Sequence, residues 1–124
     1  MTDLRDLIER LERADGPDRE LDALIWRRME NRSGVVFPDE KPGSPKYPNH
    51  IPAYTASLDA ALALKNRVLP GRAAAIGDMA FEDAHRRPWA VIWSPGGTPG
   101  PSTEGATPAI ALCLALLRTL ETEQ

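Results

Sequence analysis

The distribution of proline most constrains how this chain can fold. Of its 12 prolines, five lie between residues 31 and 53 and four lie between residues 95 and 108. Proline lacks the backbone N–H that helices and sheets use, and it disfavours helix at the residue before it. The Pro-rich connection 31–53 and the Gly/Pro-rich loop 94–106 therefore separate short regular segments. A length of 124 residues suits one domain, so we expect residues 1–124 to form a single unit.

Four segments carry the apolar periodicity of helices. In the first, Leu4, Leu7, Ile8 and Leu11 form a single stripe. The predicted helices span residues 3–14, 17–30, 56–67 and 108–121. The third leaves little polar face, which predicts deep packing, and the fourth is apolar around most of its circumference. Thr107 followed by Pro108 is typical of a helix N-cap and first position.

Two strands are predicted between the third and fourth helices. Residues 74–81 form the weaker segment, and residues 89–94 form the stronger one, which is rich in aromatic and β-branched side chains. A short connection makes them an antiparallel hairpin, and residues 35–37 are a candidate for a further strand. The expected fold class is α+β, a small antiparallel sheet layered with helices, with 94–106 as an exposed, mobile connector.

Charge and cysteine usage argue against several classes of partner. The formal net charge is −3 and the isoelectric point is about 5.4. Nucleic-acid binding and attachment to an anionic membrane surface both need surplus positive charge. The single cysteine, Cys113, excludes an intrachain disulfide, and the apolar stretch 108–117 is too short to span a bilayer. The N-terminus lacks the pattern of a signal peptide, so we expect a cytoplasmic protein without a membrane partner.

Three stretches of the chain carry a family resemblance. Residues 52–62, residues 105–117 and the opening residues 7–22 resemble the phage ABA-sandwich domain family, whose members are short phage and prophage proteins. The similarity covers about residues 4–30, 52–64 and 89–120. The sequence departs from the family pattern just after Leu64, where residues 65–70 lack an expected aromatic residue. The resemblance implies an antiparallel sheet layered with helices and a phage or prophage origin. It assigns no activity, cofactor or site residue.

No catalytic or metal-binding constellation is predicted. One cluster combines acidic residues with a histidine: Asp78, Glu82, Asp83 and His85. It offers too few convergent ligands for a metal site. These residues are better explained as solvated side chains of the hairpin. His50 has no acid or nucleophile nearby. Cys113 is flanked by leucines, which favours a small buried hydrophobe over a reactive thiol. Capping and a tyrosine–backbone bond account for the polar groups of residues 54–59, so we predict no catalytic residue, metal or cofactor.

Five residues remain as candidates for ligand binding. They are Arg86, Arg87, Trp89, Trp93 and Thr107. The two tryptophans share one face of the predicted strand. They can form a platform that binds a ligand, or they can be part of the sheet core beneath a helix, and the core is the favoured interpretation. The paired arginines are more typical of a solvated surface. A helix N-terminus attracts anions, but capping is the favoured role of Thr107 because the loop lacks a phosphate-binding motif.

The preferred functional hypothesis is a non-enzymatic phage or prophage accessory protein. It would act as a binding module for a host protein or a small ligand, and antagonism of a host defence is one such role. One alternative is a nucleotide sponge or small enzyme that uses the loop 94–107. Another is a self-associating structural component, since the apolar last helix can exceed what one small core covers.

Overall fold

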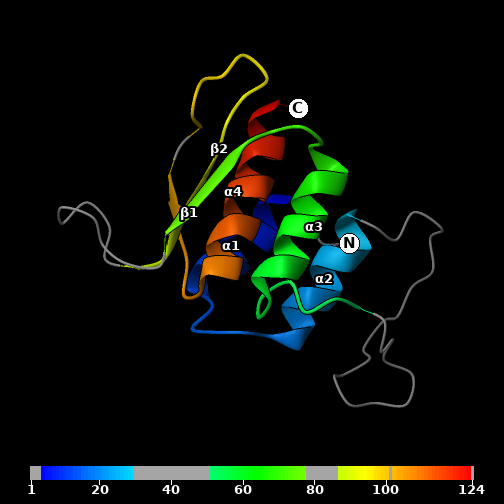
Figure 1. The fold of residues 1–124 in the computed structure, drawn as a ribbon. Helices are drawn as coiled ribbons and strands as arrows, with labels where there is room; N and C mark the ends of the chain where they lie inside the picture. Colours follow the sequence, from blue (N-terminus) through cyan, green and yellow to red (C-terminus); the bar gives the residue numbers. More distant parts are fainter. Residues whose placement is uncertain (1–3, 30–50, 78–86, 101, 124) are drawn as a thin grey trace.

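The computed structural model describes residues 4–29, 51–77, 87–100 and 102–123. In chain order these residues form α1 (Leu4–Arg13), α2 (Arg19–Met29), α3 (Leu58–Val68), β1 (Ala74–Gly77), β2 (Trp89–Ile92), β3 (Thr103–Glu104) and α4 (Pro108–Glu123). The strands make an antiparallel sheet of order β1-β2-β3, and the helices lie on one side of it (Figure 1). The predicted α+β class is confirmed.

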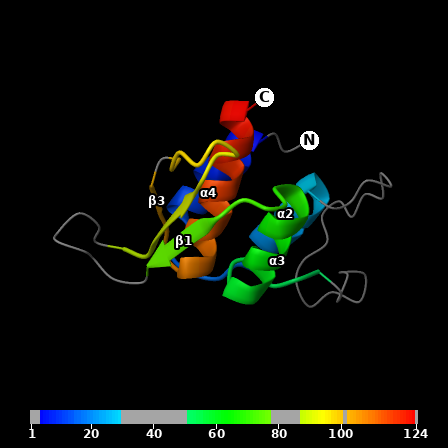
Figure 2. The ribbon, with the colours of Figure 1, turned by 45° about the horizontal axis from the view of Figure 1, so that its top comes forward.

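Helix α4 is the centre of the fold. It contacts α1, α3 and all three strands, and α1 and α3 lie on opposite sides of it (Figure 2). Residues 109–117 are all buried. A helix that is apolar around its circumference must be covered on every side, and here one chain supplies that cover. The expectation that this helix exceeds what one core can cover is therefore wrong.

Helices α1 and α2 form the predicted pair near the N-terminus. The stripe expected on the first helix is buried, from Leu4 at 7% exposure to Leu11 at 0%. Helix α2 begins at Arg19 rather than at residue 17, because the Asp18 carboxylate accepts the backbone N–H of Glu20 at 2.8 Å and so occupies the capping position. Each helix ends within two residues of its predicted boundary.

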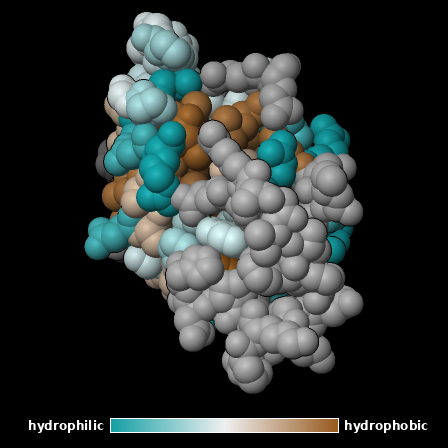
Figure 3. Space-filling view, turned by 90° about the vertical axis from the view of Figure 1, so that its right-hand side faces the viewer, coloured by the Kyte–Doolittle hydropathy of each residue, from teal (hydrophilic) through white to brown (hydrophobic). Residues whose placement is uncertain are grey.

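Helix α3 packs less deeply than its sequence predicts. Ser57 caps it by accepting the N–H of Ala60 at 3.2 Å, and Ala61, Leu64 and Lys65 are buried. The opposite side is exposed and consists of Asp59, Ala63, Asn66 and Arg67. Viewed from the side of α2 and α3, hydrophobic residues reach the surface between hydrophilic ones (Figure 3). Alanine gives this helix its apolar composition without requiring burial.

The sheet confirms the predicted antiparallel hairpin and adds an unpredicted strand. Within the hairpin, Ala74 lies opposite Ile92 and Gly77 lies opposite Trp89. The predicted segment 89–94 is shorter as a strand, since β2 ends at Ile92 and residue 93 lies in an isolated bridge with Pro99. Strand β3 falls inside the segment 94–106, which we expected to be a connector. The candidate strand at residues 35–37 and the last four residues of the predicted strand 74–81 lie outside the described residues.

Candidate functional site

The two faces of β2 have different environments. Ala90 and Ile92 are 0% and 2% exposed and face α4. Side chains alternate along a strand, so Trp89, Val91 and Trp93 point to the opposite face, where all three are half-buried. We call this surface, made of Ala75, Gly77, Trp89, Val91 and Trp93, the open face, because no described helix covers it. The favoured interpretation of the two tryptophans as sheet core beneath a helix is therefore wrong for the described part of the chain.

Close packing against a glycine positions the Trp89 ring. A Cβ atom built on Gly77 would lie 2.4 Å from Cε2 and Nε1 of the indole, so the ring covers the α-carbon of its cross-strand partner. Residue 77 can carry no side chain while the ring stays there. Glycine lowers the strand propensity of the segment that forms β1, but at residue 77 it leaves the space that the Trp89 ring occupies.

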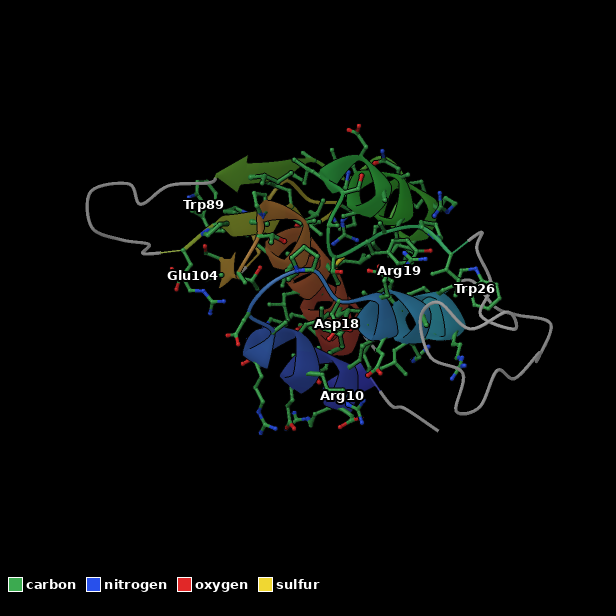
Figure 4. The ribbon with its side chains drawn as sticks, turned by 90° about the horizontal axis from the view of Figure 1, so that it is seen from below. Arg10, Asp18, Arg19, Trp26, Trp89 and Glu104 are labelled. Atoms are coloured by element: carbon green, nitrogen blue, oxygen red, sulfur yellow. The ribbon has the colours of Figure 1, made fainter. Side chains whose placement is uncertain are left out.

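Glu104 is a second neighbour of Trp89 across the sheet. The two residues are paired in the register of β2 and β3, and both lie at the same end of the sheet (Figure 4). Gly105 donates its N–H to the Pro88 carbonyl at 2.9 Å, which makes the 89–104 pair a non-hydrogen-bonded one with closely approaching side chains. An aromatic ring therefore lies beside an exposed carboxylate at this end of the open face. Sequence reasoning missed Glu104 because a strand of two residues leaves no periodic signal.

The other end of the open face is held by backbone contacts around Trp93. Its N–H donates to the Ala73 carbonyl at 2.9 Å, and its carbonyl accepts Nε of Arg72 at 2.6 Å. The chain then turns at residues 94–98, where Ser94 donates its N–H to the Thr98 carbonyl at 2.8 Å. These bonds fix the backbone beneath the Trp93 ring.

The remaining predicted site residues do not join this face as a group. Arg87 is exposed two residues before β2, and Arg86 lies outside the described residues. Thr107 accepts the N–H of Ile110 at 3.0 Å and donates its hydroxyl to the Thr55 carbonyl at 3.0 Å. The capping role of Thr107 is confirmed, and its hydroxyl serves the junction between α4 and residues 51–57.

A buried polar cluster that the sequence did not indicate joins α2 to this junction. Asp22 is 1% exposed and accepts both the N–H and the hydroxyl of Thr55 at 2.8 Å. Its other oxygen accepts Nη1 of Arg19 at 2.9 Å. Arg19 and Asp18 stand at the start of α2 in Figure 4. The carboxylate thus has hydrogen-bond donors on both oxygens, an arrangement suited to joining segments rather than to proton transfer.

Cys113 is buried near this cluster. The side chain is 1% exposed, and its thiol donates to the Tyr54 carbonyl with an Sγ–O distance of 3.7 Å. Burial, with a smaller contribution from the Asp22 carboxylate, raises the pKa of the Cys113 thiol to about 12. The thiolate is the reactive form, so the buried-hydrophobe interpretation is supported.

The described residues hold no cluster for a metal ion and no helix able to cross a membrane. Within residues 4–29, 51–77, 87–100 and 102–123 there is no group of three or more His, Cys, Asp or Glu residues that could hold a metal ion. The acidic cluster at residues 78–85 and His50 lie outside this description. Among the helices of the described segments, none has the length and apolar character needed to cross a membrane.

Comparisons with protein-family models, with curated proteins and with solved structures gave no match. The fold and the site define the class of protein as an α+β domain with helices on one side of an antiparallel sheet and an aromatic face on the other. Resemblance to the phage ABA-sandwich domain family stays a prediction from sequence.

Proposed function

We propose that this protein is a non-enzymatic binding module whose open face holds a host protein or a small ligand. The observation that supports the proposal is the alignment of Trp89, Val91 and Trp93 on a sheet face that no described helix covers. Tryptophan is enriched at interfaces because it buries a large apolar ring and still offers an N–H donor. Exposed Arg87 and Glu104 at one end supply the charged rim typical of such surfaces.

The setting we propose is that of a small phage or prophage accessory protein in the cytoplasm of a host cell. The phage or prophage origin rests on the sequence resemblance, and the cytoplasmic setting rests on the single cysteine, which suits a reducing compartment. Antagonism of a host defence by binding one of its components is one role that suits a small binding module.

The alternative of a nucleotide sponge or small enzyme has less support. It would use the segment 94–107, whose described residues form a turn, β3 and the cap of α4. The Thr107 hydroxyl makes two hydrogen bonds there, and residues 95–98 are exposed without a described cluster of ligand-binding groups around them.

The test is capture of partners from host lysate by the tagged protein and by two matched variants. Trp93→Ala removes a ring from the open face, whereas Trp26→Ala removes one from α2, where Trp26 packs on Ala23 and Ile51 at the other end of the molecule (Figure 4). We expect the Trp93 variant to lose the partner and the Trp26 variant to retain it. Circular dichroism and urea unfolding check that both variants are folded. Equal capture by the Trp93 variant, or repeated absence of both a protein partner and a co-purifying ligand, contradicts the proposal.

A further inference from the structure

The outer edge of β1 presents backbone groups that no described strand uses. The bond from Trp93 N–H to the Ala73 carbonyl fixes the phase of the β1–β2 ladder. Hydrogen-bonded and non-hydrogen-bonded pairs alternate in an antiparallel ladder, so Ala75 and Gly77 bond to β2. The N–H and C=O groups of Ala74 and Ile76 consequently point away from β2. β1 is a terminal strand in the order β1-β2-β3, which leaves these four groups at its edge.

This edge lacks the side chains that normally prevent strand pairing. Natural sheets protect their edges with charged residues, prolines or bulges. Residues 73–77 read Ala-Ala-Ala-Ile-Gly, with no charge and no proline, and the four residues of β1 are half-buried. Small side chains also permit close approach of another strand. An edge of this kind suits pairing with a strand from another chain.

Helix α3 carries a charge pattern that suits an identical partner. In Figure 4, α3 and β1 run along the same side of the molecule. Asp59, Ala63 and Arg67 are exposed on α3 at intervals of four residues, so they form one stripe. An antiparallel copy of this stripe, centred on Ala63, places each carboxylate opposite a guanidinium. The stripe is therefore complementary to itself under a two-fold rotation.

We propose that two copies of this chain associate through a two-fold axis that passes beside β1 and α3. Across the axis, Ala74 of one copy pairs with Ile76 of the other, which satisfies the edge groups with four hydrogen bonds. Ala75 then lies directly opposite its own counterpart. The middle of β1 and the middle of α3 lie at a similar level in Figure 1, so one axis can serve both contacts. Such an isologous contact closes at two copies.

The association joins the two sheets into one of six strands, β3-β2-β1-β1-β2-β3, counted from the described strands. Side chains keep their faces when a sheet is continued across an antiparallel pair. Both sets of Trp89, Val91 and Trp93 therefore lie on the same side of the joined sheet. Self-association thus extends the open face rather than covering it, and it does not depend on which partner that face holds.

The test uses charges placed on the two-fold axis. Ala75 is half-exposed on the open face, where a Lys or Glu side chain can reach water. In a non-hydrogen-bonded pair the side chains nearly touch, and like charges there are destabilising. We expect the unsubstituted protein to form a concentration-dependent dimer in analytical ultracentrifugation. We expect Ala75→Lys and Ala75→Glu each to weaken the dimer by up to about fivefold, and their equimolar mixture to restore it as a heterodimer.

A second pair of variants tests the helix contact independently. Asp59→Arg should weaken the dimer by placing guanidinium groups opposite each other, and adding Arg67→Asp should restore it by reversing both signs. These positions are on the surface of α3 and leave β1 unchanged. A monomer at all concentrations for the unsubstituted protein overturns the proposal. A dimer whose dissociation constant is unchanged in both Ala75 variants also overturns the proposal. A dimer whose dissociation constant is unchanged in both α3 variants contradicts the helix contact.

Discussion

Asp22 and Thr55, 33 positions apart, are joined by two hydrogen bonds to the same carboxylate oxygen, each 2.8 Å long. The Thr55 hydroxyl also accepts the N–H of Asp18 at 2.8 Å. This one hydroxyl therefore bonds both to Asp18, just before α2, and to Asp22 within α2. The next contact in this chain of bonds is the one from Thr107 to the Thr55 carbonyl at 3.0 Å. Three segments distant in sequence thus meet at one buried point.

Removal of the buried carboxylate should be costly. We expect Asp22→Ala to lower the free energy of unfolding by about 3 kcal/mol, because it leaves the N–H and hydroxyl of Thr55 without their acceptor. Thr55→Val should cost about 2 kcal/mol, and the double variant should cost less than the sum because the two changes remove one shared contact. Urea unfolding measures all three. The exposed Glu9 provides the control, since Glu9→Ala should stay within about 0.5 kcal/mol.

The Cys113 thiol should make stability fall at alkaline pH. Folding raises its pKa from 9.0 to about 12, so the folded state holds the proton that the unfolded state releases between these values. The stabilisation is complete below pH 9 and is lost as the pH rises toward 12, by about 1.4 kcal/mol per pH unit. Urea unfolding compared with Cys113→Ala isolates this effect from other groups that titrate there. Identical pH profiles for the two proteins would contradict the assignment.

The same burial predicts slow thiol chemistry in the native protein. We expect a thiol reagent at pH 8 to modify Cys113 only as fast as the chain unfolds, and to react at once in denaturant. The time course of modification, followed by mass spectrometry, measures this. Rapid labelling of the native protein would place the thiol in a more open environment than the structure gives it.

A methyl group at residue 77 should displace the Trp89 ring. Gly77→Ala puts a Cβ atom 2.4 Å from the indole, and we expect a loss of about 1–3 kcal/mol in the free energy of unfolding together with altered near-UV circular dichroism. In a Trp89→Ala background the same substitution should be nearly neutral, because the obstructing ring is gone. Gly16→Ala is the matched control, since nothing lies within 4 Å of its Cβ position.

Loss of the α4 cap should weaken the junction with residues 51–57. Thr107→Ala removes the acceptor for the Ile110 N–H and the donor to the Thr55 carbonyl, so we expect a loss of about 1–2 kcal/mol. Thr107→Ser keeps the hydroxyl and should retain most of the stability. Thermal and urea unfolding compare the two. Equal losses for the alanine and serine variants would mean that the methyl group, not the hydroxyl, stabilises the junction.

Local patterns determined much of the architecture. The stripe from Leu4 to Leu11, the Thr107–Pro108 start of α4 and the aromatic strand at Trp89 each depend on contacts within a few residues, and each is present in the structure. Periodicity and capping are properties of short segments, which is why one sequence suffices to predict them. The α+β class follows from the order of those segments.

Tertiary structure decided which faces are covered, because burial depends on elements that meet only after folding. Sequence could not tell that the all-apolar α4 is enclosed by one chain while alanine-rich α3 stays exposed on one side. Alternation placed Trp89 and Trp93 on one face, but only the packing of α4 on Ala90 and Ile92 made that face the open one. The Asp22–Thr55 contact left no local signal, since a buried carboxylate and a solvated one look the same in sequence.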